Sequence, residues 1–220
     1  MNQIKDLLNL NIHLGRKVNE WHPKMLPFIY SESNGMHVLN VFQTEQLLIK
    51  AKKFLKQQID NNTNILFVGT KKSAISIIEK KANLLNQFCI NNSWLPGLLT
   101  NWETTKDQIA TLNLLEFEKK KDSFALLTKK ERSLKFKKLL VLNKYLKGIR
   151  YMKNLPSVLV VVDSQIEKIA IEEAKKLKIK VIALIDSNTN PNNIDYPIPS
   201  NTDSPKSIYY IFEELFNFNR

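Results

Sequence analysis

Short, uninterrupted apolar runs recur along the chain and indicate strands that are buried on both faces. Residues 65–68 read Ile-Leu-Phe-Val, and residues 158–162 read Val-Leu-Val-Val-Val. Such runs are typical of parallel strands that lie between two layers of helices. Similar short segments occupy residues 36–41, 88–90 and 181–185, and we predict that these are strands too.

A helix is predicted before these strands, at residues 3–10, and further helices between them, at residues 47–59 and 73–85. Further helix starts are indicated by the capping-box spacing of Ser164 and Glu167 and by the Ser204-Pro205 pair. Because strands and helices alternate, we predict an α/β fold: a parallel sheet covered by helices on both faces, of the flavodoxin or Rossmann type. Residues 11–35 are rich in His, Pro, Gly and Ser, and we expect them to form an irregular N-terminal arm held by a partner.

The alternation is interrupted by residues 102–150, which contain two apolar stripes at helical spacing. Thr128 and Glu131 have capping-box spacing and mark the start of the second helix. Two such helices predict an antiparallel hairpin, and their narrow stripes suit a two-helix coiled coil. We therefore expect an α/β domain with its arm, residues 1–101 and 151–220, and an inserted hairpin, residues 102–150. The stripes are formed by Ile109, Leu112 and Leu115, and by Leu139, Leu142, Leu146 and Ile149.

Positive charge is concentrated in the predicted hairpin. The whole chain holds 33 Lys and Arg against 21 Asp and Glu, a net charge of +12. Residues 106–150 alone hold 13 basic and 5 acidic side chains. A basic excess of this size favours a polyanionic partner, nucleic acid before a membrane. A solvated helical surface and a hairpin that docks an acidic protein are the alternatives.

Ten basic residues are the candidates for RNA binding, chosen from charge and expected exposure. A helix N-terminus with nearby lysines can hold a phosphate, which brings in the residues after Gly69. The candidates are Arg16, Lys17 and Lys24 on the arm, Lys71 and Lys72 at a helix start, and Lys106, Lys129, Lys130, Arg132 and Lys135 on or near the hairpin.

An enzyme is the main alternative. Asp163 and Asp186 follow predicted parallel strands, and ligands of open α/β sheets bind at that edge. A nucleotide- or sugar-phosphate-binding enzyme would use both carboxylates. However, a phosphate-binding P-loop with Lys72 as its lysine would need glycines at positions 66 and 71, which are Leu66 and Lys71 here. Ordinary turns also explain the two aspartates.

The remaining polar residues do not suggest a cofactor or a metal. The histidines and Cys89 lack the spacing of metal ligands, so we expect neither a metal nor a cofactor. A single cysteine forms no internal disulfide, which favours a reducing compartment. We expect Cys89 to be a small buried side chain.

The segment from Trp94 to Trp102 carries the most specific motif. It is an apolar loop with a Pro96-Gly97 turn, and Thr100 and Glu103 have capping-box spacing. The loop resembles a Trp-Leu-Gly-Gly-Leu/Met-Leu-Thr-Asn stretch of the second protein of the small ribosomal subunit, the S-two family in its bacterial and organellar branch. Matching motifs occur in order at His13-Leu14-Gly15, at residues 21–29, at residues 65–71, at residues 155–163 and at residues 185–199. The chain departs from the family at Ser93, usually arginine, at Pro96, usually glycine, and at residues 200–203.

This resemblance implies a structural constituent of the small ribosomal subunit and no enzyme. The family is expected to bind small-subunit rRNA between head and body, beside neighbouring ribosomal proteins, with no membrane and no homo-oligomer. It is also expected to support assembly and translation. Abundant Lys, Asn, Ile and Leu, whose codons are rich in A and T, and the lack of a visible presequence favour a plastid (chloroplast) ribosome. A mitochondrial or a bacterial cytoplasmic ribosome is the alternative.

Overall fold

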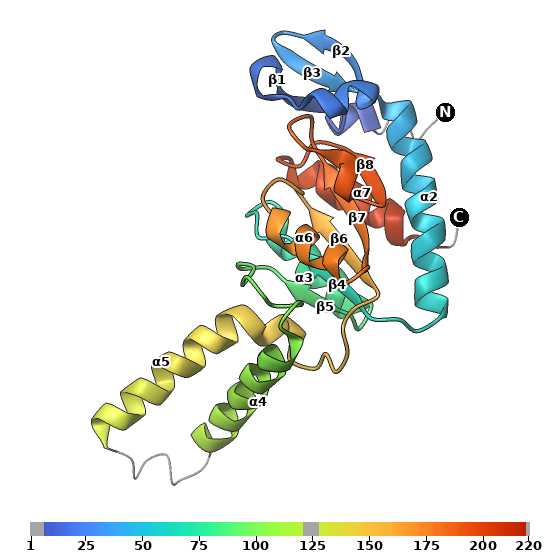
Figure 1. Cartoon of the computed structure of the whole chain (residues 1–220). Helices are drawn as coiled ribbons and strands as arrows, with labels where there is room; N and C mark the ends of the chain where they lie inside the picture. The colour runs from blue at the N-terminus through green and yellow to red at the C-terminus, as the bar shows by residue number, and fades with distance from the viewer. Residues whose placement is uncertain (1–6, 121–127, 219–220) are drawn as a thin grey trace.

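A five-stranded parallel sheet forms the centre of the protein in a computed structural model that describes residues 7–120 and 128–218. The strand order is β5-β4-β6-β7-β8 (Figure 1). Three predicted strands are confirmed at their expected bounds, and the fourth begins one residue early. They are β4 (Ile65–Val68), β5 (Phe88–Ile90), β6 (Val158–Val162) and β7 (Lys180–Ile185).

The fifth strand, β8 (Tyr196–Pro199), was not predicted from the sequence. Two of its four residues are prolines, which lack the N–H that an interior strand needs. The strand lies at the edge of the sheet and pairs only with β7, so one side of its backbone needs no strand partner. A carbonyl on β8 is nevertheless used: Pro199 O accepts a hydrogen bond of 2.7 Å from Thr44 Oγ1.

Helices cover both faces of the sheet, as the apolar runs predicted. Phe67, Val160 and Leu184 face one layer, and their neighbours Leu66, Val161 and Ala183 face the other. Alternate residues of one strand therefore enter two separate cores. The first core is covered by α2 (Val41–Asp60), α3 (Ile75–Leu84) and α7 (Pro205–Phe216), and the second by α6 (Lys168–Lys176), the Trp94 loop and the base of the hairpin.

Helix starts follow the expected caps at some positions. Ser204 caps α7 and Pro205 is its first residue, as predicted. Helix α2 begins six residues before the expected position, because the Asn40 side chain accepts hydrogen bonds from the N–H groups of Phe42 and Gln43. Residues 7–9 are helical, while the rest of the predicted helix at residues 3–6 lies outside the described residues.

The N-terminal arm is not irregular, so that prediction was wrong. Its two strands pair with β3, the strand predicted at residues 36–41, which ends at Leu39; together they form a three-stranded antiparallel sheet, in the order β1-β3-β2, at one end of the molecule in Figure 1. Asn34 and Gly35 both have positive φ, at 50° and 73°, as the tight turn between β2 and β3 requires. The elements are β1 (Leu14–Lys17), η1 (Val18–Glu20), η2 (Pro23–Phe28), β2 (Ile29–Ser33) and β3 (Met36–Leu39).

The hairpin consists of α4 (Trp102–Lys119) and α5 (Lys129–Leu146), which contact each other, and ends in η4 (Lys147–Ile149). Figure 1 shows both helices projecting from the sheet domain at the end opposite the small sheet. The connection between them lies outside the described residues. The capping box of Thr128 and Glu131 is confirmed. All members of the two predicted stripes are buried except Leu142, which is partly buried.

Candidate nucleic-acid interface

The exposed basic residues of the hairpin lie toward the end of α5 that is remote from the sheet. Lys129, Lys130 and Arg132 occupy the first turn of α5 and are exposed. Lys135 is partly buried because its ammonium group donates to Glu118 Oε2 of α4 at 2.7 Å. Lys106 lies near the base and forms an ion pair with Glu103 at 2.8 Å. The candidate cations of the hairpin therefore lie in two places, toward the remote end of α5 and near the base of α4.

The arm candidates divide into two kinds. Lys17 and Lys24 are exposed, and the backbone N–H of Lys24 donates to His22 Nδ1 at 3.2 Å. Arg16 points instead toward the carboxyl edge of the parallel sheet. Its guanidinium group lies 3.0 Å from Asp203 Oδ1 and 3.5 Å from Asp186 Oδ2.

The two lysines after Gly69 also differ. Lys72 is exposed, whereas the ammonium group of Lys71 lies 2.8 Å from Asp163 Oδ2 and 2.5 Å from Asp203 Oδ1. The structure therefore brings Arg16 and Lys71 together in one network with three carboxylates. Helix α3 begins only at Ile75, with no side-chain cap, so Lys71 and Lys72 precede the helix by a turn.

Asp163 and Asp186 do lie at the same edge of the sheet, and both are buried. Asp163 has a φ of 66°, which is uncommon for a residue with a side chain. Thr202 Oγ1 lies between them and donates to Asp163 Oδ2 at 3.1 Å. The role of Thr202 and Asp203 was not foreseen, because no local pattern links residues so far from Arg16 and Lys71 in sequence. The carboxylates are matched by cations of the protein itself.

Burial raises the pKa of Asp186 to about 6, although the N–H of Ser187 and the charge of Arg16 favour the carboxylate. An unfolded aspartate has a pKa of about 3.9. The native state therefore binds the proton more tightly than the unfolded state. The stability that this difference contributes is full below about pH 4 and is lost as the pH rises through about 6.

Replacing Asp186 with Asn should remove this pH dependence. Between about pH 3.5 and 7.5, the unsubstituted protein should lose about 3 kcal/mol of unfolding free energy through Asp186. Asp186→Asn should not show this loss. Urea denaturation at a series of pH values measures the unfolding free energy of both proteins. A difference between the two proteins that stays constant across the range would contradict the role of Asp186.

Glu167 does not form the predicted capping box with Ser164. Helix α6 begins at Lys168 with no side-chain cap, and the Glu167 carboxylate crosses to Thr70. It accepts hydrogen bonds from Thr70 N at 2.8 Å and from Thr70 Oγ1 at 2.7 Å. Burial raises the pKa of Glu167, while the bonds from Thr70 oppose that rise. Glu167 thus fixes the turn that precedes Lys71.

The loop after Trp94 is organised around one buried carboxylate, Glu173 of α6. Thr100 does not cap α4 as predicted, because its N–H and hydroxyl both donate to Glu173. Burial raises the pKa of Glu173, but the hydrogen bonds to its carboxylate outweigh burial, so the pKa lies below the usual range. The donors are Trp94 Nε1, Gly97 N, Leu99 N, Thr100 N and Thr100 Oγ1, at 2.8–3.2 Å.

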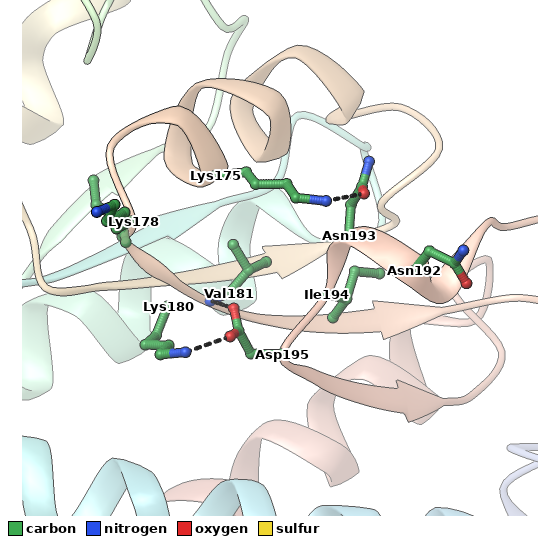
Figure 2. A pocket seen from close by; sticks show the side chains of 9 residues that line it. Lys175, Lys178, Lys180, Val181, Asn192, Asn193, Ile194 and Asp195 are labelled. Carbon is green, nitrogen blue, oxygen red and sulfur yellow. Dashed lines mark hydrogen bonds and ion pairs between the residues drawn. The ribbon is translucent and has the colours of Figure 1, made fainter.

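A further basic surface was missed by the selection of candidates from sequence. Lys175, Lys178 and Lys180 border a cavity of about 400 Å³, which lies between the segment joining α6 to β7 and residues 192–195 (Figure 2). Lys175 Nζ donates to Asn193 Oδ1 at 2.6 Å, and Lys180 Nζ donates to Asp195 Oδ1 at 2.7 Å. The sequence signal was the density of lysines in residues 175–180. It was concealed because residues 151–220 as a whole hold 8 basic and 9 acidic side chains, a net charge of −1.

Within residues 7–120 and 128–218, no group of three or more His, Cys, Asp or Glu side chains is placed to hold a metal ion. Over the same ranges, no helix is both long enough and apolar enough to cross a membrane. Cys89 is buried and unbonded, and burial raises the pKa of its thiol to about 11.

Comparison with known proteins gives matches over nearly the whole chain. The family model described as ribosomal protein S2 matches residues 7–217. The small ribosomal subunit protein uS2c of Phaeodactylum tricornutum is 42% identical over 96% of this chain and 94% of its own length. Two relatives named small ribosomal subunit protein uS2 are similarly close. That of Chlamydia pneumoniae is 45% identical over 96% of this chain and 76% of its own length, and that of Picosynechococcus is 39% identical over 96% and 83%.

These matches agree with the motifs on both sides of the hairpin and with the structure. The Trp94 loop, the strand β4 and the residues that follow β6 and β7 all lie inside the matched region. The chain belongs to the ribosomal protein S2 family.

Proposed function

We propose that this protein, a structural component of the small ribosomal subunit, holds rRNA mainly through the exposed cations of its hairpin. The observation that carries the proposal is the concentration of positive charge in residues 106–150, which run through the hairpin to just past η4 and hold 13 basic against 5 acidic residues. Phosphate contacts supply most of the affinity of such a surface and position the protein without reading sequence. The expected place is between head and body, beside neighbouring ribosomal proteins.

The individual contacts follow from exposure. Lys129, Lys130 and Arg132 at the remote end of α5 and Lys72 on the domain are exposed. Lys17 and Lys24 form a second exposed set on the small sheet, at the opposite end of the molecule (Figure 1). Arg16 and Lys71 are each partly buried between two carboxylates, so we assign them to fixing the small sheet and the β4 turn at the sheet edge.

We further propose a plastid ribosome as the location. Several relatives carry the name uS2c, including those of Phaeodactylum tricornutum, Trieres chinensis and Cyanophora paradoxa. The codon preference inferred from the composition agrees with this. Bacterial relatives are similarly close, so the cellular compartment has to be measured.

Sedimentation through a sucrose gradient tests the place and the partner together. In extract from isolated plastids, the chain should migrate with the small subunit at low salt, and ribonuclease should release it. Migration near its own mass, 25.6 kDa, in untreated extract would contradict the ribosomal role. Absence from plastids together with presence in another compartment's small subunit would contradict the plastid location only.

Neutralising the hairpin should weaken RNA binding and its dependence on salt. Each lost phosphate contact lowers the salt slope by about 1, so replacing five cations with Gln should lower it by up to about 5 and the affinity at least about tenfold. Binding to a small-subunit rRNA fragment is measured across a salt series. The variant carries Gln at Lys106, Lys129, Lys130, Arg132 and Lys135.

A matched control removes the same number of charges from the other side of the domain, on α2 and at the start of α7. If it lowers the salt slope as much as the hairpin variant does, the hairpin is not the main contact. The control carries Gln at Lys50, Lys52, Lys53, Lys56 and Lys206.

The enzyme alternative is not supported. The ribosomal protein S2 family is structural and non-enzymatic. Asp163 and Asp186, which an enzyme would need for its ligand, are buried and paired with Lys71 and Arg16.

A further inference from the structure

A groove of about 750 Å³ lies where the hairpin joins the sheet domain. One wall comes from α3, the following turn and the edge strand β5. The other comes from the end of α5, η4 and the residues after it. The volume falls in the range typical of sites that enclose a small ligand.

The chemistry of the walls combines three kinds of group. Carboxamides are frequent, and Asn83, Asn86 and Asn143 supply both donors and acceptors. Lys144, Lys147 and Arg150 supply positive charge against the single carboxylate of Glu79.

Three aromatic side chains line the groove, Phe88, Tyr145 and Tyr151, and Tyr151 is the exposed one. Its side chain is 79% exposed, which is unusually open for a tyrosine beside a folded core. The guanidinium carbon of Arg150 lies 5.7 Å from the centre of its ring. Arg150 is itself held by Glu116 of α4. Arg150 therefore lies over the ring, and most of Tyr151 stays open to solvent.

Together these groups match an unpaired RNA segment better than a duplex or a protein. Unpaired bases stack on exposed aromatic rings and use carboxamides for their edges, while lysines meet the phosphates. A duplex has its base faces covered, and an acidic peptide of Asp and Glu has no flat ring to stack on the tyrosine. We propose that this groove binds an unpaired RNA segment, with one base stacked on Tyr151 and phosphates beside Lys144 and Lys147.

This inference rests on the proposed RNA-binding function and assigns to it a second kind of contact. The hairpin lysines bind phosphates irrespective of pairing, whereas Tyr151 would select unpaired nucleotides. Substitution of Tyr151 should therefore affect single-stranded RNA much more than duplex RNA, and that difference separates the two proposals.

The experiment measures binding of the full chain to a fluorescent oligouridylate of about eight nucleotides and to an RNA duplex of about 16 base pairs, by anisotropy. Tyr151→Ala should weaken oligouridylate binding roughly tenfold and leave duplex binding within about twofold. Tyr151→Phe keeps the ring and should retain binding. Tyr209→Ala serves as the matched control, because Tyr209 is 54% exposed but lies on α7 beside Glu213.

Three further outcomes would overturn the inference. If the unsubstituted protein binds the duplex but Tyr151→Ala leaves oligouridylate binding unchanged, the groove is not an RNA site and the hairpin proposal stands. If polyglutamate binds the unsubstituted protein and Tyr151→Ala weakens that binding, the groove takes an acidic protein instead. Failure of the unsubstituted protein to bind either RNA would overturn both proposals.

Discussion

Replacing Glu173 with Gln is expected to lower the free energy of unfolding by about 3–5 kcal/mol, a large fraction of the total stability of a typical domain. The carboxylate accepts five hydrogen bonds from the Trp94–Thr100 loop and is buried. A glutamine amide has one oxygen and one NH₂ group, so its NH₂ group would face N–H donors at Leu99 and Thr100. Buried donors left without an acceptor account for the loss.

The measurement is urea denaturation at neutral pH, followed by tryptophan fluorescence because Trp94 is one of the donors. Glu172→Gln is the matched control: Glu172 is exposed, lies 3.9 Å from Lys168, and should change stability by less than about 0.5 kcal/mol. The pKa of Glu173 is depressed, so the stability it contributes is present above about pH 4.5 and is lost as the pH falls through its native pKa. Equal losses in the two variants would show that Glu173 does not organise the loop.

Replacing Gly148 with Ala should destabilise the junction between hairpin and sheet by about 1–3 kcal/mol or more. A Cβ atom at this position would lie 1.9 Å from the carbonyl oxygen of Cys89 and 2.9 Å from its carbonyl carbon. Those atoms belong to β5, whose backbone pairs with β4, so they have little freedom to move. Either the edge strand or the base of the hairpin must shift.

Denaturation gives the stability change, and limited proteolysis at the hairpin base reports whether η4 has moved away from β5. Lys153→Ala, at an exposed residue shortly after the junction, is the control and should leave both measurements unchanged. If Gly148→Ala were as stable and as resistant as this control, the close approach of η4 to β5 would be absent in solution.

The sheet was predictable because its signals are local. Every residue of β4 and β6 is buried, and an unbroken apolar run is the direct record of that environment. Of the small N-terminal sheet only β3 was predicted, and β1 and β2 were missed although Asn34-Gly35 is a strong hairpin signal, because both are only four or five residues long and largely exposed or partly buried. The edge strand β8 was missed because its prolines argue against a strand everywhere except at an edge.

The capping boxes show where local rules stop. Thr128 and Glu131 form their box on an exposed helix end, where nothing else competes for the two side chains. Glu167 has the same spacing but bonds to Thr70, and Thr100 bonds to Glu173. In both cases the side chain binds a residue that is distant in sequence, and a local spacing rule cannot predict such a partner.

The same limit applies to the candidate interface. Counting charge located the hairpin as the basic element, since a run of lysines is visible in the sequence itself. It did not distinguish Lys71, which is paired with Asp163, from its exposed neighbour Lys72. The groove at Tyr151 was also invisible, because its two walls come from segments that the hairpin separates in sequence.

The position of the hairpin in the chain has a consequence for how the protein folds during synthesis. Strands β4 and β6 are neighbours in the sheet, yet the entire hairpin is translated between them. Contacts between residues close in sequence form faster than distant pairings. The hairpin is therefore expected to reach its structure on the nascent chain before β6 completes the sheet, so the cationic element would be available to RNA while the domain that carries it is still being assembled.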